Sequence, residues 1–330
     1  MIAQLDRLQI RLQPASVYPR LFSHFFLQGR PLTTRARWLN KAVLLQFSLV
    51  KRFPVLKKVE KPVFVLGTGR SGTTILGKIL SLHPHINFLN EPKAIWYAAY
   101  SQEDLIGNYT LGPAHYRLGA EDVTPEVIKV VHQLYGYGLR STGRQRVLDK
   151  YPEMIFRVPF ILSIFPDAKF IFLIRNGQDT SQSIEKWSQQ ASTVTKAATH
   201  DWWGVDHRKW HLLVRDIVNK EPLWKPYRQD VAAFTQDKDM AVVEWIATMQ
   251  EGLQLSHKIP MQLHKVYYEK LINSPRATLE ALLEFCELPQ DQPTMNYAEQ
   301  TLNSVDSKKH FSVHPSIEPL FTATMHTLGY

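Results

Sequence analysis

A cluster of glycine and hydroxyl residues is the sequence feature with the clearest chemistry. Gly67 and Gly72 are separated by four residues, and Thr73 and Thr74 follow directly. Glycines let the backbone turn so that successive N–H groups converge on one anion, and a following helix adds its positive N-terminal end. The hydroxyls and the guanidinium of Arg70 add further donors. The spacing therefore predicts a phosphate-binding turn.

Thr73 stands where loops that bind nucleoside triphosphates have a lysine. That lysine reaches the β and γ phosphates and neutralises their charge. A loop without it is poorly suited to ATP, but it suits a ligand with one phosphate and one terminal group. The alternative is a tight turn whose glycines serve only packing; the strand expected before it and the helix expected after it favour the anion site.

Two strand–turn–helix units would hold these groups. Residues 63–66 (VFVL) are typical of a buried strand, and apolar residues at helical spacing predict a helix over 75–82. Residues 169–174 (KFIFLI) predict a second buried strand, which ends at Arg175 and precedes a helix over 179–187. Buried strands that alternate with helices predict an α/β fold, a three-layer α/β/α arrangement with a central parallel sheet.

The rest of the chain extends this pattern. Residues 265–268 predict another strand and residues 277–286 a helix, while the tryptophan-rich stretch 188–239 predicts helices and loops over the sheet. No linker is evident within this part. We therefore expect a single domain over 61–330, preceded by a basic, mainly helical extension over 1–60.

Three segments resemble the motifs of one family. Residues 65–74 (VLGTGRSGTT) resemble the 5′-phosphosulfate loop of the sulfotransferases that use 3′-phosphoadenosine 5′-phosphosulfate (PAPS), particularly the tyrosylprotein-sulfotransferase-like branch. Residues 170–183 (FIFLIRNGQDTSQS) resemble its 3′-phosphate motif, a strand ending in arginine with a serine eight residues on. Residues 265–289 are similar to its late tyrosine–glutamate segment and helix. The resemblance implies transfer of a sulfuryl group from PAPS to an acceptor hydroxyl, with adenosine 3′,5′-bisphosphate as product and no metal.

The resemblance also implies which residues hold the cofactor. The 5′ side would be bound by the loop residues Gly69, Arg70, Ser71, Gly72, Thr73 and Thr74. The 3′-phosphate would be bound by Arg175 and Ser183, because an arginine fork and a hydroxyl suit a phosphate. The alternative for Arg175 is a surface ion pair with Asp179.

Catalytic roles follow from the same resemblance. Glu91 matches the family's catalytic glutamate and is the expected general base, with Lys93 near the acceptor. Lys150 matches a lysine that contacts the transferred group and its leaving oxygen, and Arg70 supports the same charge. Asn90 replaces the first of two adjacent acids that the family usually has, a departure that bears on peptide acceptors more than on the base.

Further residues leave alternatives open. His83 and His85 are rival bases, although a histidine beside proline at a helix end is more often structural. Family serine and lysine contacts have loose counterparts near the C-terminus, at Ser304, Ser307, Lys308 and Lys309.

Charge is concentrated at the N-terminus of this 330-residue chain, whose net charge is +9. Residues 1–62 hold 12 Lys and Arg and two acids, whereas the rest hold 27 basic and 28 acidic residues. A basic arm favours an anionic partner, and a peripheral contact with an anionic membrane is expected rather than nucleic acid. Residues 38–50 predict a helix that either packs on the domain or lies on such a membrane.

No segment has the ~18 consecutive apolar residues needed to span a bilayer. The start of the chain also lacks the order of a signal peptide. A cytoplasmic location is the expectation, with an organelle transit peptide as the alternative.

Two other functions remain open from the sequence. A P-loop nucleotide kinase or hydrolase would share the fold, but the loop lysine and a clear acidic Mg²⁺ partner are missing. A non-catalytic membrane-associated adaptor would keep the fold without the chemistry. The acceptor of a sulfotransferase could be a sugar, a lipid-linked glycan, a peptide tyrosine or a small alcohol.

Overall fold

The structure is a computed structural model that describes residues 4–29, 38–194, 198–302 and 311–330. Five parallel strands form the central sheet in the order β2-β3-β1-β4-β8. They are β1 (Val63–Gly67), β2 (Ile86–Asn90), β3 (Arg146–Lys150), β4 (Lys169–Ile174) and β8 (Leu263–Tyr267). Because all five run in the same direction, their carboxyl ends lie at one edge of the sheet, where open α/β sheets bind ligands.

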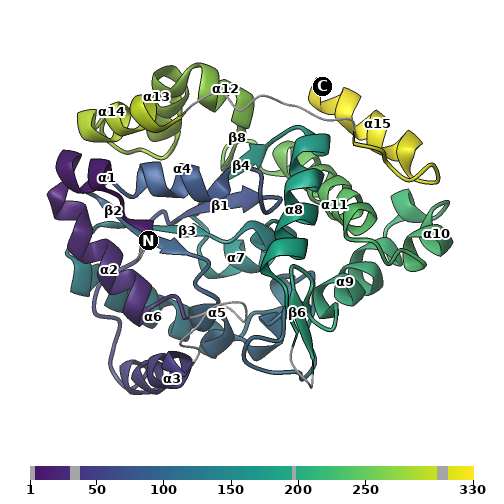
Figure 1. The fold of residues 1–330 in the computed structure, drawn as a ribbon. Coiled ribbons are helices and arrows are strands. Elements are labelled where there is room, and N and C mark those ends of the chain that lie inside the picture. The colour runs from purple at the N-terminus through teal and green to yellow at the C-terminus, as the bar shows by residue number, and fades with distance from the viewer. Residues whose placement is uncertain (1–3, 30–37, 195–197, 303–310) are drawn as a thin grey trace.

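Helices cover both faces of this sheet (Figure 1). One face carries α4 (Thr73–Leu80), α12 (Tyr268–Asn273), α13 (Pro275–Phe285) and α14 (Gln292–Thr301). The other carries α5 (Lys93–Ala99), α6 (Pro125–Thr142), α7 (Val158–Ile164), α8 (Gly177–Ala191) and α11 (Asp237–Lys258). Along β1, Val65 faces the first layer and Phe64 the second, as the twofold alternation of a strand requires. The predicted three-layer α/β/α fold is confirmed.

The predicted strand–turn–helix units are present with small shifts at their ends. The strand predicted over 169–174 is β4, and the helix expected over 75–82 is α4, which begins two residues earlier. The helix expected over 179–187 is α8, which begins at Gly177 because the Asn176 side chain accepts hydrogen bonds from the first N–H groups.

The tryptophan-rich stretch forms a small sheet as well as helices. Its strands β5 (Thr193–Val194), β6 (Thr199–Asp201) and β7 (Gly204–Val205) are antiparallel. They are followed by α9 (Arg208–Leu213) and α10 (Arg228–Ala232), and α15 (Glu318–Leu328) lies near the C-terminus. Trp203 and Trp224 are fully buried, so these indoles belong to the core rather than to a ligand site.

The N-terminal helices are α1 (Arg7–Leu12), α2 (Val17–Phe26) and α3 (Leu39–Val50). Asp6 pairs with Lys78 of α4 at 2.6 Å, and Val43 and Phe47 of α3 are buried in the core that covers one face of the sheet. The helix expected over 38–50 therefore packs on the domain, and the boundary at residue 60 stays a prediction. Within the described ranges, no helix combines the length and the apolar character needed to cross a bilayer.

Candidate active site

The glycine-rich loop joins β1 to α4 at the carboxyl edge of the sheet. Gly72 has a φ of 100° and forms the N-cap of α4, and Arg70 also has a positive φ, 68°. Both the Ser71 hydroxyl and the Ser71 N–H donate to the Thr68 carbonyl, at 2.6 Å and 3.2 Å. The loop is therefore held in a turn that a β-branched residue at position 72 could not adopt without strain.

Two arginines meet beside this loop. Arg175, directly after β4, donates from Nη1 to the Arg70 carbonyl at 3.0 Å, and its guanidinium lies 4.5 Å from the centre of the Tyr268 ring. Arg70 in turn donates from Nε to the Ser183 hydroxyl of α8 at 3.3 Å. Burial, together with the nearby Arg175, lowers the pKa of Arg70. The two guanidinium groups and Ser183 thus face one small region.

Positive charge in that region has no carboxylate partner in the described ranges of the chain. Among the described residues, no Asp or Glu forms an ion pair with Arg70 or Arg175. The Nε of Arg175 is also buried and has no hydrogen-bond partner in the described part of the chain. Adjacent cations without a counterion favour an anionic ligand, because such a ligand supplies the missing charge.

Glu91 and Lys150 meet at the ends of the neighbouring strands β2 and β3. The Lys150 Nζ lies 2.6 Å from Glu91 Oε1, and the Glu91 N–H donates to the Lys150 carbonyl at 2.7 Å. Lys93 Nζ is 3.6 Å from Glu91 Oε2. Burial alone would raise the pKa of Glu91, but the ammonium groups of Lys150 and Lys93 outweigh it and lower that pKa. Glu91 is therefore held as a carboxylate.

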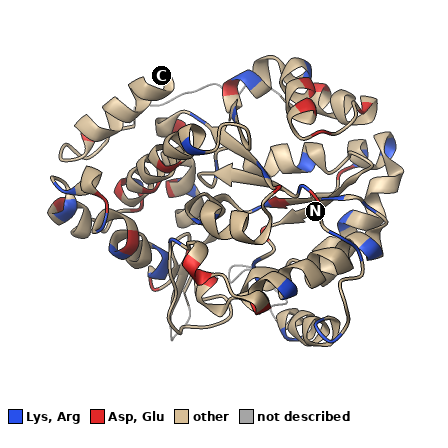
Figure 2. Ribbon diagram, turned by 180° about the vertical axis from the view of Figure 1, so that it is seen from behind, with Lys and Arg blue, Asp and Glu red and all other residues tan. Residues whose placement is uncertain are grey.

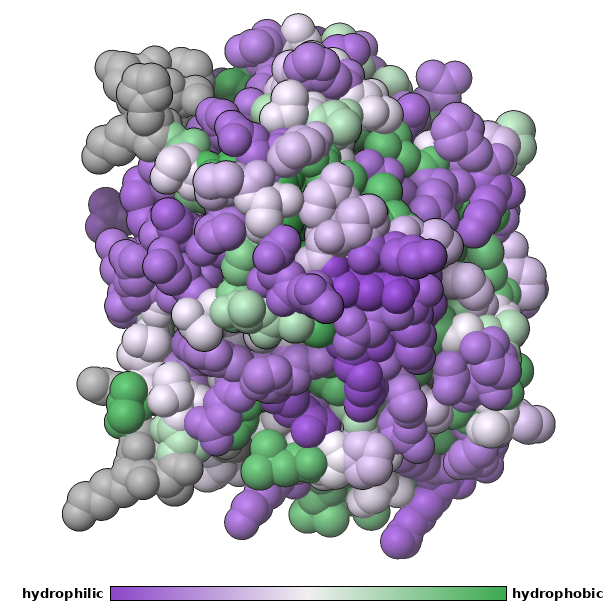
Figure 3. Space-filling view, turned by 90° about the vertical axis from the view of Figure 1, so that its right-hand side faces the viewer, coloured by the Kyte–Doolittle hydropathy of each residue, from purple (hydrophilic) through white to green (hydrophobic). Residues whose placement is uncertain are grey.

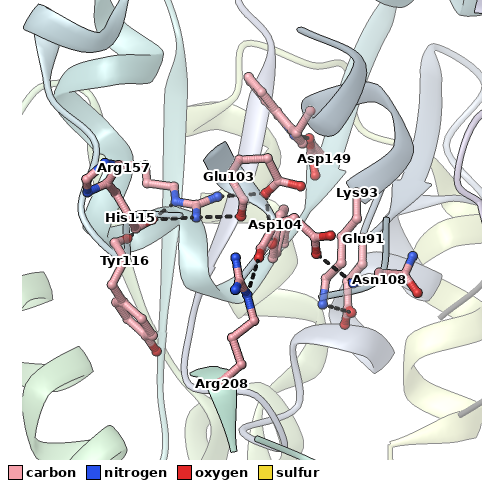
Figure 4. Close-up of polar contacts among 12 residues, drawn as sticks. Glu91, Lys93, Glu103, Asp104, Asn108, His115, Tyr116, Asp149, Arg157 and Arg208 are labelled. Carbon is pink, nitrogen blue, oxygen red and sulfur yellow. Dashed lines mark hydrogen bonds and ion pairs between the residues drawn. The ribbon is translucent and has the colours of Figure 1, made fainter. Parts of the chain in front are cut away.

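A buried pair lies behind this cluster. Arg157 Nη1 contacts Glu103 Oε2 at 2.8 Å, and both side chains are buried. Figure 4 shows Glu91 and Lys93 side by side, beyond the Glu103–Arg157 pair. Tyr151 links the two groups, because its hydroxyl donates to Glu103 at 3.1 Å and its ring packs 5.1 Å from the Lys93 ammonium. The Glu103–Arg157 pair thus holds Tyr151, whose ring contacts Lys93.

The loop, the arginines and Glu91 line one cavity of about 370 Å³. Ten of the eleven predicted site residues line it: Gly69, Arg70, Gly72, Thr73, Thr74, Glu91, Lys93, Lys150, Arg175 and Ser183. The exception is Ser71, whose two donors are used inside the loop. The cavity brings together residues more than one hundred positions apart in the sequence.

Other cavity residues were not predicted. They are Ile75, Ile106, Pro152, Glu153, Trp187, Asp201, Trp202 and Lys209. Trp202 packs against the loop so closely that a Cβ on Gly69 would lie 2.4 Å from its ring. This contact gives Gly69 a packing role that the loop spacing alone did not reveal.

A buried lysine holds this side of the cavity. Lys209 Nζ lies 2.5 Å from Glu244 and 3.1 Å from Glu153, and 4.6 Å from the centre of the Trp202 ring. Burial alone would raise the pKa of Glu153, but Lys209 and Lys93 outweigh it and lower that pKa to about 2. Burial alone would lower the pKa of Lys209. The carboxylates of Glu244 and Glu153 raise that pKa by more than burial lowers it, so the net shift is upward. The network ties α9 and α11 to the end of β3.

Lys209→Met should lower the free energy of unfolding by about 3–5 kcal/mol, because it leaves two carboxylates buried without their cation. Urea unfolding would measure this loss, with Lys186→Met on the exposed face of α8 as the matched control. The double variant Lys209→Met/Glu244→Gln should recover part of it. An unfolding free energy like that of the control would contradict the structural role of Lys209.

The two histidines that were rival bases lie outside the lining of the cavity. His83 is buried, its Nε2 lies 2.9 Å from the Pro289 carbonyl, and its Nδ1 accepts from the His85 N–H. Neither histidine lines the cavity. The four C-terminal residues Ser304, Ser307, Lys308 and Lys309 lie outside the described residues.

Fold and loop together define an open α/β protein with a glycine-rich loop between its first sheet strand and the following helix. The chain belongs to the Sulfotransferase family, whose model matches residues 62–222 and 213–292. Sulfuryl transfer is the activity of this class of enzyme, and the resemblance stated from the sequence is confirmed.

Relatives with assigned names include enzymes that act on protein tyrosine. A putative protein-tyrosine sulfotransferase of Caenorhabditis briggsae is 23% identical over 257 residues, which cover 76% of this chain and 74% of that protein. Protein-tyrosine sulfotransferase A of Caenorhabditis elegans is 23% identical, over 71% of this chain and 52% of that protein. An uncharacterized Aquifex aeolicus protein is 25% identical over 252 residues. These residues cover 72% of this chain but only 27% of the Aquifex aeolicus protein.

Solved structures share the fold at low identity. The sulfotransferase domain of the curacin biosynthetic pathway has a TM-score of 0.51 at 16% identity, covering 83% of this chain and 99% of that domain. The sulfotransferase domain of the Synechococcus PCC 7002 olefin synthase has a TM-score of 0.50 at 17% identity, covering 83% and 96%. These similarities support the fold and carry no information on substrate.

Proposed function

We propose that this sulfotransferase binds PAPS in the cavity and transfers its sulfuryl group to an acceptor hydroxyl. The observation that carries the proposal is the pair Arg70 and Arg175, which lies between the loop and Ser183 and has no carboxylate partner among the described residues. A nucleotide with phosphate at both its 5′ and 3′ ends provides anionic groups for both arginines. The orphaned Nε of Arg175 fits such a ligand, because it has a donor to offer.

Each end of the nucleotide has its own set of donors in this proposal. The N–H groups at the start of α4, with the hydroxyls of Thr73 and Thr74, would hold the 5′ side. Arg175 and Ser183 would hold the 3′-phosphate, and Arg70 lies between the two ends. When bound, PAPS would supply the sulfuryl group, and adenosine 3′,5′-bisphosphate would be the leaving group through its 5′-phosphate oxygen.

Glu91 would remove the proton of the acceptor, and Lys150 would stabilise the negative charge that develops on the leaving group. The Glu91 carboxylate would accept the proton of the acceptor hydroxyl, and Lys93 would lie beside that hydroxyl. Lys150, 1% exposed and fixed by Glu91, would hold positive charge beside the leaving oxygen. These fixed cations supply the charge that the reaction needs, so the proposal includes no metal.

The acceptor is proposed to be an alcohol or phenol. Because relatives are named as protein-tyrosine sulfotransferases, a peptide tyrosine is the first acceptor to test. Sugars, lipid-linked glycans and small alcohols form the rest of the panel.

Ligand-dependent stability and turnover test the proposal together. Adenosine 3′,5′-bisphosphate at a hundred times its Kd should raise the free energy of unfolding by about 2.7 kcal/mol. At equal concentration, 5′-AMP and ATP with Mg²⁺ should raise it less, and labelled PAPS should lose its sulfuryl group to one of the acceptors. Stronger stabilisation by ATP with Mg²⁺ would instead support a kinase or hydrolase.

A further inference from the structure

Helix α3 is apolar on two opposite faces. Val43 and Phe47 point into the core, whereas Trp38, just before the helix, and Leu45 and Leu49 lie on the other side. At 100° per residue, positions 38, 45 and 49 fall within one narrow stripe. Trp38 is 71% exposed and Leu45 is 65% exposed. Packing on the domain therefore explains only one of the two faces.

The loop after α3 extends the exposed stripe. The side chains of Phe53, Val55 and Leu56 are all exposed. Their backbone is nevertheless held in place, because the Gln133 amide of α6 donates to the carbonyls of Lys51 and Phe53. These apolar side chains are therefore exposed to solvent although α6 fixes their backbone.

Further anchors hold the same segment. Lys51 donates from Nζ to the Ala98 carbonyl at the end of α5, and Lys57 donates to the Arg144 carbonyl at 2.5 Å. A Cβ on Gly136 of α6 would lie 2.4 Å from the Lys57 carbonyl oxygen, so helix and loop are in close contact. The position of the loop is determined by the domain, not by its own apolar side chains.

The exposed large apolar residues of the protein gather in this region. Of the fourteen in the described ranges, six lie between residues 38 and 56, and Phe25 and Phe26 lie at the end of α2. The Gln46 side chain of α3 donates to the Phe26 carbonyl at 3.3 Å, which places the end of α2 beside α3. By contrast, the side of the molecule that carries α10 and α15 is mainly hydrophilic, with scattered apolar groups (Figure 3). We call residues 38–58 the docking surface.

Charge on the docking surface is of one sign. Residues 38–58 contain five basic residues and no acid: Lys41, Lys51, Arg52, Lys57 and Lys58. Lys41 and Arg52 are exposed beside the apolar stripe, and Lys58 is exposed next to Glu60, its ion-pair partner. Figure 2 shows blue and no red on α3, whose charged residue is Lys41. An apolar stripe flanked by cations is the pattern of a surface that lies on anionic lipid.

We propose that residues 38–58 dock the protein on an anionic lipid bilayer, with the apolar stripe in the interface and the basic side chains at the lipid headgroups. A second copy of the chain is a poorer occupant, because a twofold contact would bring the exposed Lys41 and Arg52 of both copies together at one interface. Loop residues held by α5 and α6 enter the interface without folding first. This proposal does not depend on the identity of the sulfuryl donor or acceptor.

Vesicle co-sedimentation of the full chain tests the proposal. Wild-type protein should bind vesicles of phosphatidylcholine and phosphatidylserine at least about tenfold more strongly than vesicles of phosphatidylcholine alone. The variant Leu45→Gln/Leu49→Gln/Phe53→Ser should lose at least about tenfold in partitioning, because the apolar contact is removed. The matched control Val194→Gln/Met261→Gln changes exposed apolar residues outside the docking surface and should bind like wild type.

A charge variant gives an independent measure. Lys41→Glu/Arg52→Glu should abolish the preference for phosphatidylserine, while thermal melting shows that each variant remains folded. Equal binding by wild type and the apolar triple variant, or no binding of wild type to either vesicle, would overturn the proposal. So would a wild-type dimer in light scattering that the triple variant loses without any vesicle binding, because it would assign the surface to a second copy of the chain.

Discussion

Glu91→Gln should lower kcat for sulfuryl transfer by ~10²–10⁴ while adenosine 3′,5′-bisphosphate binds with nearly unchanged affinity. The amide keeps the size of the side chain and can still accept a hydrogen bond from Lys150, but it is a far weaker base. Steady-state kinetics with PAPS and calorimetric titration of the bisphosphate measure the two effects separately. Full activity in this variant would remove Glu91 from the mechanism.

The choice of glutamine matters because Lys150 is buried. Glu91→Ala would leave the Lys150 ammonium without its partner at 2.6 Å, and loss of one member of a buried pair costs about 3–5 kcal/mol. A lower activity in the alanine variant would then mix lost chemistry with lost structure. Glu280→Gln, on the exposed side of α13, is the matched control for the loss of one carboxylate.

The acid side of the pH profile distinguishes the candidate bases. Because the pKa of Glu91 lies below its ordinary value, the active carboxylate persists as pH falls, and kcat/KM should decline only below about pH 4.5. A histidine base of ordinary pKa would instead lose activity below about pH 6.5. Burial lowers the pKa of His83, but its ring contacts the Pro289 carbonyl and lies away from the cavity.

The predictions that succeeded depended on local pattern. The run KFIFLI is apolar at every position after Lys169, and it forms the buried β4 that such a run indicates. The spacing of Gly67 and Gly72 placed the loop between a strand and a helix, and the structure has β1 and α4 there. Each of these signals lies within about ten residues, so no long-range contact was needed to recognise it.

The elements that were missed depend on partners far along the chain. Strand β3 (Arg146–Lys150, RVLDK) carries two charged residues that are fully buried, so its sequence does not look like a strand. Asp149 is accommodated because Trp96 donates to it at 2.8 Å and Tyr135 also donates to it. Burial raises the pKa of Asp149 to about 7, even with these donors. Such compensation appears only once the chain is folded.

The same reasoning applies to the missed side of the cavity. Lys209 comes from a polar, tryptophan-rich stretch. Of its two partners, Glu153 lies in the segment that follows β3, and Glu244 lies on α11. Nothing in the local sequence around Lys209 distinguishes it from a solvated lysine. A lysine that is 2% exposed between two carboxylates is a tertiary feature.

Arg175→Ala should weaken the binding of adenosine 3′,5′-bisphosphate by roughly ten- to 150-fold, which corresponds to the ~1.5–3 kcal/mol of a charge-assisted contact. The affinity for 5′-AMP, which lacks the 3′-phosphate, should change much less. Arg140→Ala, on the exposed face of α6, is the control for the loss of one guanidinium. Equal losses for both nucleotides would mean that Arg175 does not hold the 3′-phosphate.

Arg70→Ala should weaken the binding of both adenosine 3′,5′-bisphosphate and 5′-AMP. Arg70 extends from the glycine-rich loop to Ser183 and so would lie between the two ends of the ligand. The double variant Arg70→Ala/Arg175→Ala then measures the coupling between the arginines. Since the Arg175 charge helps to lower the pKa of Arg70, the two guanidinium groups interact, and the two losses should not add. Strictly additive losses would indicate that the two arginines contact the nucleotide independently of each other. Unchanged affinity for the bisphosphate in both single variants would show that the cavity binds some other ligand.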